Sequence, residues 1–225
     1  MSTRVSVLDT TQMQRVGSQI GSNPAGIFQD QQGQRYYVKE LESVAHARNE
    51  WLAAQLYRLA GAPTLTYVPT RNPLQIATRW VELEKRYVAH LDQPEREQAQ
   101  HWLGVHAWTA NWDAVGLTGD NQGVFQGRVL TLDLGGALAF RAQGDPKGRA
   151  FGRQVEELER LRASGHNAQA YALFGDMSES QLEAAIRVVT ALSDSQIAET
   201  VLGNAGSEAL VDKMLARKQD MARRL

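Results

Sequence analysis

Strand-like and helical patterns occupy different parts of this chain, and their order limits the folds that it can adopt. Segments rich in β-branched and aromatic residues recur up to residue 132, the last two being the strand candidates 123–125 and 128–132. Beyond residue 150, apolar residues recur at helical spacing nearly to the last residue. A strand-rich first part followed by a helix-rich second part predicts an α+β fold with two lobes and a hinge near residues 81–90.

The first part is expected to form a small lobe. A polar leader over 1–16 is followed by a hairpin punctuated by glycines, which ends in the strand-like segment 35–39. A helix is predicted over 44–60, where apolar residues recur at helical spacing before Gly61 and Pro63 stop it. Further strands are predicted over 64–68 and 74–81.

The second part is expected to be mostly helical. Asp92 and Pro94 mark the start of a helix, and a tight turn at 126–127 predicts a short hairpin after it. Ser178 and Gln181 have capping-box spacing, and Asp194 is predicted to cap the next helix. The remaining helices are predicted over 152–163, 167–174, 179–192, 194–202 and 207–223. The basic residues of the last helix are interleaved with acids, which indicates a solvated face.

Composition limits the partners and the location. The 225 residues include 24 basic and 25 acidic side chains, so no nucleic-acid or membrane partner is implied. Cysteine is absent, which excludes disulfides and thiolate metal sites. We expect neither a Sec signal nor membrane insertion, because no apolar run of the necessary length exists. We expect a cytoplasmic protein, or an effector secreted into a host or target cell.

Three polar residues follow one another in an order that suits phosphoryl transfer. Asp113 lies in a loop after a predicted helix, Asn121 follows it, and Asp133 stands where a strand meets two glycines. Carboxylate and amide oxygens are the ligands that Mg²⁺ prefers. Phosphoryl transfer needs little more than a held triphosphate, a placed metal charge and a carboxylate that orients the acceptor.

With these residues in their motifs, the sequence resembles the protein-kinase-like superfamily over about residues 16–150. The motifs are Ile-Gly-Ser-Asn-Pro-Ala-Gly, Tyr-Tyr-Val-Lys, Asn-Trp-Asp-Ala-Val-Gly and Asp-Leu-Gly-Gly. The resemblance is to the atypical branch with HipA-like and phosphoinositide-type kinases, and to small bacterial and phage-associated kinase-like domains of toxins and effectors. It implies a minimal two-lobed kinase-like fold, with a nucleotide-binding N-lobe over 17–83 and a catalytic C-lobe over 84–225.

The resemblance also implies a role for each matching residue. Asp113 would be the catalytic base, Lys39 would contact the phosphates of ATP, and Glu50 would pair with Lys39. The metal ligands for Mg²⁺ would be Asn121 and Asp133. The residues implied to cover the phosphates are Gly21, Ser22 and Gly26, and those of the adenine hinge are Glu82 and Leu83.

Some departures and rival residues accompany this match. The chain lacks a tight G-x-G-x-x-G, a His-Arg-Asp before the base and an Ala-Pro-Glu after the metal ligand. Glu40 and Glu42 are alternative partners for Lys39. Asp120 is an alternative base or metal ligand, since it precedes Asn121 directly.

The predicted function is an ATP- and Mg²⁺-dependent kinase that acts on a hydroxyl acceptor. A Ser or Thr of a protein is the first expectation for that acceptor. Two alternatives within enzymes are transfer of AMP and phosphorylation of a lipid or small molecule. An alternative from another class is a pseudokinase-like module that binds a nucleotide or a partner without catalysis.

Overall fold

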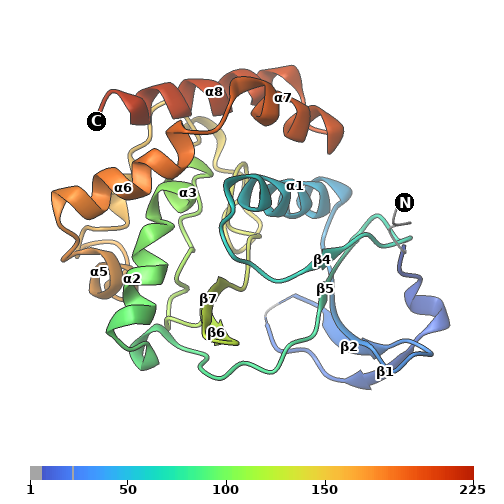
Figure 1. Cartoon of the computed structure of the whole chain (residues 1–225). Helices are drawn as coiled ribbons and strands as arrows, with labels where there is room; N and C mark the ends of the chain where they lie inside the picture. The colour runs from blue at the N-terminus through green and yellow to red at the C-terminus, as the bar shows by residue number, and fades with distance from the viewer. Residues whose placement is uncertain (1–6, 22) are drawn as a thin grey trace.

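A small antiparallel sheet packs beside a larger helical part in the computed structural model, which describes residues 7–21 and 23–225 (Figure 1). The sheet has the strand order β1-β2-β3-β5-β4, and every neighbouring pair is antiparallel. Its strands are β1 Gln14–Gly17, β2 Ala25–Gln29, β3 Arg35–Glu40, β4 Tyr67–Val68 and β5 Gln75–Arg79. This arrangement confirms the predicted α+β fold.

The first strand begins within the segment that the sequence pattern assigned to a polar leader. Residues 14–16 belong to β1, in which Arg15 pairs with Phe28 of β2, and a short 3-10 helix, Thr10–Gln12, precedes it. Most side chains of this edge strand are exposed, so the strand has no alternation of apolar residues to reveal it. The predicted strands 64–68 and 74–81 are also longer than the observed β4 and β5.

Helix α1, Val44–Ala60, has the predicted bounds because both of its ends are capped. The Ser43 side chain accepts a hydrogen bond from the His46 amide, and Gly61 ends the helix in the left-handed conformation with φ of 76°. The apolar face of α1, including Leu56 and Tyr57, belongs to the same buried core as the helices of the second part. The helix that carries Glu50 is therefore anchored in the larger part of the molecule.

The helical part contains one short hairpin, β6 Gln122–Phe125 and β7 Arg128–Thr131. In Figure 1, α7 and α8 lie at the top of the view, above α1. The helices of this part are α2 Gln93–His101, α3 Leu103–Trp108, α4 Glu157–Arg160, α5 Ala168–Phe174, α6 Glu179–Thr190, α7 Asp194–Gly203 and α8 Glu208–Ala222. Short 3-10 turns occur at Val88–His90 and Gly148–Ala150. Over residues 7–21 and 23–225, no helix combines the length and apolar character needed to cross a membrane.

Helix starts follow their side-chain caps. The capping box of Ser178 and Gln181 is confirmed at the start of α6. The predicted cap of α7 is wrong: Ser193 is the N-cap and forms a capping box with Gln196, while Asp194 is the first helical residue. Helix α4 is shorter than the predicted 152–163, because the chain over 151–155 follows a bent path before the helix begins.

The interpretation of the last helix as a solvated basic face is wrong for Arg217. This side chain is fully buried and its Nη2 lies 2.7 Å from Glu157 Oε2. Its other hydrogen bonds go to backbone carbonyls, those of Ala107, Trp108, Gly152 and Gln154. A guanidinium has five donors in a fixed plane, so one arginine satisfies carbonyls from several segments. Arg217 thus joins α8 to the end of α3 and to the segment before α4.

The buried imidazole of His106, on α3, gives folding a dependence on pH. It is fully buried, its Nδ1 lies 2.8 Å from the Tyr57 hydroxyl, and burial lowers its pKa to about 3. The unfolded chain has a histidine pKa of about 6.5, so below that pH the unfolded state binds one more proton. The free energy of unfolding is therefore expected to fall by about 1.4 kcal/mol per pH unit as pH decreases from about 6.5 toward 4.

Urea unfolding of wild type and of His106→Gln, at neutral pH and at pH about 5, measures this contribution. Other groups titrate in both proteins, so the difference between the two pH dependences belongs to His106. Wild type should lose about 2 kcal/mol more than the variant over this interval. Equal losses would show that His106 does not carry the dependence.

Candidate active site

A cavity of about 870 Å³ lies between the sheet and the helical part. This volume is in the range of sites that enclose small molecules and cofactors. Most of the predicted site residues line it, although they come from β3, α1 and the segments that follow β1, β5, α3 and β7. Those residues are Gly21, Lys39, Glu50, Leu83, Asp113, Asn121 and Asp133.

Lys39, on β3, joins two carboxylates in the cavity. Its Nζ lies 2.6 Å from Glu50 Oε1 and 3.2 Å from Asp133 Oδ1. Burial lowers the pKa of Lys39, but the charges of Asp133 and Glu50 outweigh it and hold that pKa above its usual value. For Asp133, burial raises the pKa, but the charge of Lys39 and the hydrogen bond from the Gly135 amide outweigh burial and bring the pKa below its usual value. Both groups are therefore charged at neutral pH.

Glu50 is the carboxylate that contacts Lys39, whereas the rivals Glu40 and Glu42 are exposed. Only 1% of Glu50 is accessible to solvent, and burial raises its pKa against the opposing effect of Lys39. The Tyr67 hydroxyl on β4 also donates to Glu50 Oε1, at 3.1 Å. Glu50 is thus fixed from two strands, and it holds the lysine in place.

Asp113 and Asn121 face each other across the loop that follows α3. The Asn121 side-chain amide donates to Asp113 Oδ2 at 2.9 Å and to the Asp113 carbonyl at 2.7 Å. Burial, together with the charge of Asp133, raises the pKa of Asp113 to about 6 against the effect of Asn121. This carboxylate is ionised at neutral pH and basic enough to accept a proton. The rival Asp120 is exposed but also lines the cavity.

The loops that carry Asp113 and Asp133 are joined by the buried ammonium of Lys147. Its Nζ donates to three carbonyls, those of Ala110, Gly136 and Leu138, at 2.7–2.9 Å. Ala110 and Leu138 have φ of 51° and 53°, a left-handed conformation that is unfavourable for residues with a side chain. Lys147 therefore stabilises strained backbone in both loops.

Helix α1 also holds the segment that follows Asp133. The Asn49 side chain donates to the Ala137 carbonyl at 2.9 Å and accepts from the Ala139 amide at 3.0 Å. One turn earlier, His46 Nε2 lies 2.8 Å from the Gly144 carbonyl. The same helix thus positions Glu50 and fixes the course of residues 137–144.

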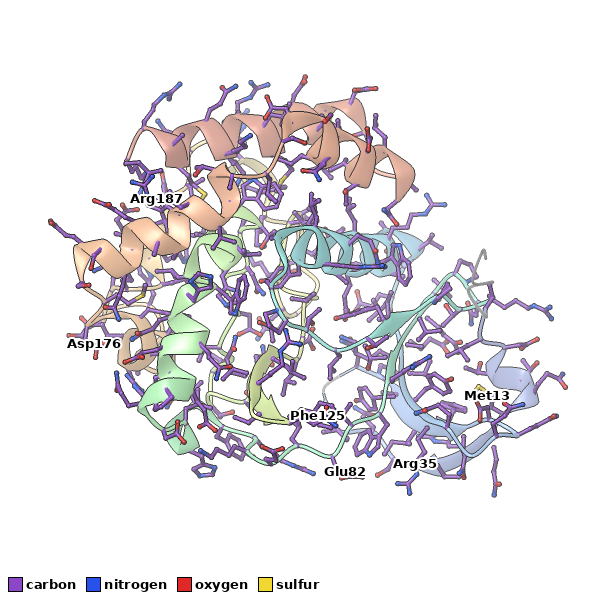
Figure 2. The ribbon with its side chains drawn as sticks, in the orientation of Figure 1. Met13, Arg35, Glu82, Phe125, Asp176 and Arg187 are labelled. Atoms are coloured by element: carbon purple, nitrogen blue, oxygen red, sulfur yellow. The ribbon has the colours of Figure 1, made fainter. Side chains whose placement is uncertain are left out.

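Not all of the predicted binding residues lie at the cavity. Gly26 is in β2, where a Cβ would come within 2.7 Å of Arg15 Nε, so its lack of a side chain serves strand packing. Glu82 is exposed, accepts a hydrogen bond from Trp80 Nε1 and lies near Arg35, as Figure 2 shows. Ser22 lies outside the described residues. Of the glycine loop, Gly21 lines the cavity, and the Tyr37 hydroxyl accepts a hydrogen bond from its amide.

The residues at the cavity fit a magnesium ion. Asp133 uses Oδ1 for Lys39 and Gly135, which leaves Oδ2 available as a ligand. Asn121 uses its nitrogen for Asp113, so its oxygen is available as well. Around Lys39, the carboxylates of Glu50, Asp113 and Asp133 outnumber its single ammonium, and a divalent cation would neutralise this local excess of negative charge. Oxygen donors and net negative charge are what Mg²⁺ requires.

Four residues of the site were not found from the sequence: Asn49, Tyr67, Trp112 and Lys147. Trp112 lines the cavity next to Asp113. The only local signal for Asn49 was its place one residue before Glu50 on a helix. Lys147 gave no signal, because its carbonyl partners come together only in the folded chain.

The two lobes, and a lysine, a helix glutamate and two aspartates at the cavity between them, define a protein-kinase-like fold. Among solved structures, the proinflammatory kinase CtkA of Helicobacter pylori matches with a TM-score of 0.60 at 11% sequence identity. The match covers 97% of this chain and 94% of that one, so the fold is shared over nearly the full length of both.

A second solved structure matches weakly, and sequence comparisons find no relative. The aminoglycoside phosphotransferase of Alicyclobacillus acidocaldarius subsp. acidocaldarius DSM 446 has a TM-score of 0.36 and 12% identity over 93% of this chain and 91% of that one. A TM-score this low does not establish a shared fold. No family model matches the sequence, and no curated protein does. The fold is thus shown, and the HipA-like assignment stays a prediction.

Proposed function

We propose that this protein is a kinase that transfers the γ-phosphoryl group of ATP to a hydroxyl acceptor, a Ser or Thr of a protein substrate. The observation that carries the proposal is the convergence of Lys39, Glu50, Asp113, Asn121 and Asp133 on one cavity. These groups come from segments up to 94 residues apart in the chain. A cluster of charged groups that is buried in a cleft is typical of an active site.

The proposed reaction makes one bond to phosphorus and breaks one. The acceptor oxygen bonds to the γ-phosphorus, the bond from that phosphorus to the β,γ-bridging oxygen breaks, and ADP leaves with its electron pair. The proton of the hydroxyl passes to the Asp113 carboxylate. Asn121 holds this carboxylate in one orientation, so it is placed to accept that proton.

The nucleotide is held on the other side of the cavity. The Lys39 ammonium has three donors, of which Glu50 and Asp133 accept two, so the third is free for a phosphate oxygen of ATP. Asn121 and Asp133 would hold Mg²⁺, which supplies positive charge to the phosphate oxygens. Glu50 keeps the lysine in position, because its own carboxylate is fixed by Tyr67.

The test uses ATP labelled at the γ- or the α-phosphate, incubated with Mg²⁺ and a protein lysate, for wild type and Asp133→Ala. We expect transfer of the γ-label to protein by wild type and none by the variant, with both proteins folded by circular dichroism. Transfer of the α-label would instead show adenylyl transfer. Nucleotide binding without transfer of either label would leave a pseudokinase-like module and overturn the proposal.

The place of action is a separate proposal. The cytoplasm, or a host or target cell reached by secretion, is what the sequence predicts, and fractionation of the producing cells with an antibody decides between them.

A further inference from the structure

The indole ring of Trp112 lies beside the proposed base and is held in one orientation. Trp112 directly precedes Asp113 and lines the same cavity. Its Nε1 donates to Glu157 Oε1 at 3.0 Å, and the other oxygen of Glu157 accepts from the buried Arg217. Both oxygens of this buried carboxylate are therefore occupied, and the ring is anchored in the core of the helical part.

Three basic side chains lie close to this ring. The Arg160 guanidinium carbon lies 4.2 Å from the ring centroid, Lys147 Nζ lies 5.0 Å from it, and the Arg141 guanidinium carbon lies 5.2 Å from it. All three are close enough for a cation–π interaction. Lys147 directs its three donors to backbone carbonyls, but Arg141 and Arg160 also line the cavity.

The two arginines have no counterion among residues 7–21 and 23–225. Neither forms an ion pair or a side-chain hydrogen bond there, and the acids of α4 next to Arg160 are occupied elsewhere: Glu157 binds Arg217, and Glu159 binds Arg224. The pKa of Lys147 is lowered to about 7, mainly by burial and also by the charges of Arg217, Arg141 and Arg160. The positive charges of Arg141 and Arg160 thus lie together at the part of the cavity that Trp112 lines.

We infer that Arg141 and Arg160 bind an oxyanion that the acceptor carries close to its reactive hydroxyl. This inference rests on the proposed function, since it names the class of acceptor for the same site. Guanidinium groups match the oxygens of carboxylates and phosphates, and contact with the Trp112 ring keeps both groups near the proposed base. The expected acceptor is a Ser or Thr near an acidic or a phosphorylated residue, and the triphosphate of ATP lies on the side of Lys39.

Transfer to matched peptides tests the inference. Peptides with a single Ser carry Ala, Asp or phosphoserine at each of the neighbouring positions, so that the carboxylate and the phosphate are compared separately. We expect kcat/KM for the best acidic or phosphorylated peptide to exceed that for its Ala counterpart by about tenfold or more. Arg160→Gln and Arg141→Gln are each expected to lower kcat/KM for the anionic peptide by about tenfold, the scale of one hydrogen bond to a charged group. Arg187→Gln is the control for net charge, because Arg187 lies on α6 at the periphery of the molecule (Figure 2).

Binding of the same peptides, measured by fluorescence anisotropy, separates this inference from the proposed function. Tighter binding of the anionic peptide that is lost in Arg160→Gln, without any transfer, would keep the oxyanion site and reject the kinase. Equal binding of Ala and anionic peptides by wild type would overturn the oxyanion site. A rise in KM for ATP in the arginine variants, with peptide preference unchanged, would also overturn it, because the arginines would then hold the nucleotide.

Discussion

Asp113→Asn is expected to lower kcat for phosphoryl transfer by about 10²–10⁴-fold, the usual contribution of a general base. Asparagine has nearly the same shape as aspartate, and it can still contact Asn121. It cannot accept a proton at neutral pH. The similar shape matters, because a Cβ at Gly136 would lie 3.0 Å from the Asp113 Cβ and the two loops leave little free space. Steady-state transfer of γ-labelled phosphate measures kcat, and calorimetry should show an affinity for ATP within about twofold of wild type.

Asp120→Asn is the matched control for this prediction. Asp120 lines the same cavity one residue before Asn121, and it is exposed. If Asp113 is the base, Asp120→Asn should change kcat by no more than about twofold, since substitution of an exposed carboxylate that does not accept the proton has little effect. A large loss in Asp120→Asn with an active Asp113→Asn would assign the base to Asp120 instead.

The secondary structure around each polar residue of the site was predictable, because each of them stands in a local sequence pattern. Lys39 lies one residue before the end of a strand, Glu50 lies in a helix with clear capping residues, and Asp133 follows the second strand of a hairpin. These settings depend on neighbours in the sequence, so local patterns predicted them, while the roles that the resemblance implies for these residues stay predictions. Their convergence was implied by resemblance alone, since no local pattern determines how β3, α1 and the second hairpin pack.

Gly26 and Arg217 show what local patterns leave out. The resemblance implied that Gly26 covers the phosphates, whereas β2 begins at Ala25 and places Gly26 inside the sheet. Arg217 was expected in solvent because charged residues surround it, yet carbonyls from two distant segments keep it buried. Whether a glycine serves a turn or close packing, and whether a charge is buried, depends on tertiary contacts. Sequence periodicity does not contain them.

Lys147 makes tertiary contacts of this kind, with three backbone carbonyls. The substitution Lys147→Met is expected to lower both stability and activity. Methionine has a similar length but no donor, so three buried carbonyls lose the only donor that they have within residues 7–21 and 23–225. An unpaired buried acceptor costs about 1–3 kcal/mol. Part of the cost for the three carbonyls is offset, because the variant no longer buries a charged ammonium. We expect a net loss of about 3 kcal/mol, which for a domain of this size lowers Tm by about 6–12 °C.

The matched control for Lys147→Met is Lys213→Met. Lys213 also lies over an aromatic ring, that of Phe151, but it donates to a single carbonyl at 2.7 Å and is only partly buried. Its loss is expected to lower Tm by about 2–4 °C, as for one hydrogen bond. Calorimetry compares the two variants. Equal shifts would mean that the three carbonyls at Lys147 find other donors.

The effect on activity follows from which carbonyls Lys147 holds. Ala110 lies just before the loop of Asp113, Gly136 and Leu138 lie just after Asp133, and two of the three are in the unfavourable left-handed conformation. Without the ammonium, both loops can relax toward ordinary backbone angles, and the base moves relative to the metal ligands. At a temperature where the variant is folded, kcat should therefore fall by about tenfold or more, because small displacements of catalytic groups are costly. Lys213→Met should keep kcat near the wild-type value. A Lys147→Met protein with normal kcat would show that Lys147 stabilises the fold without positioning the site.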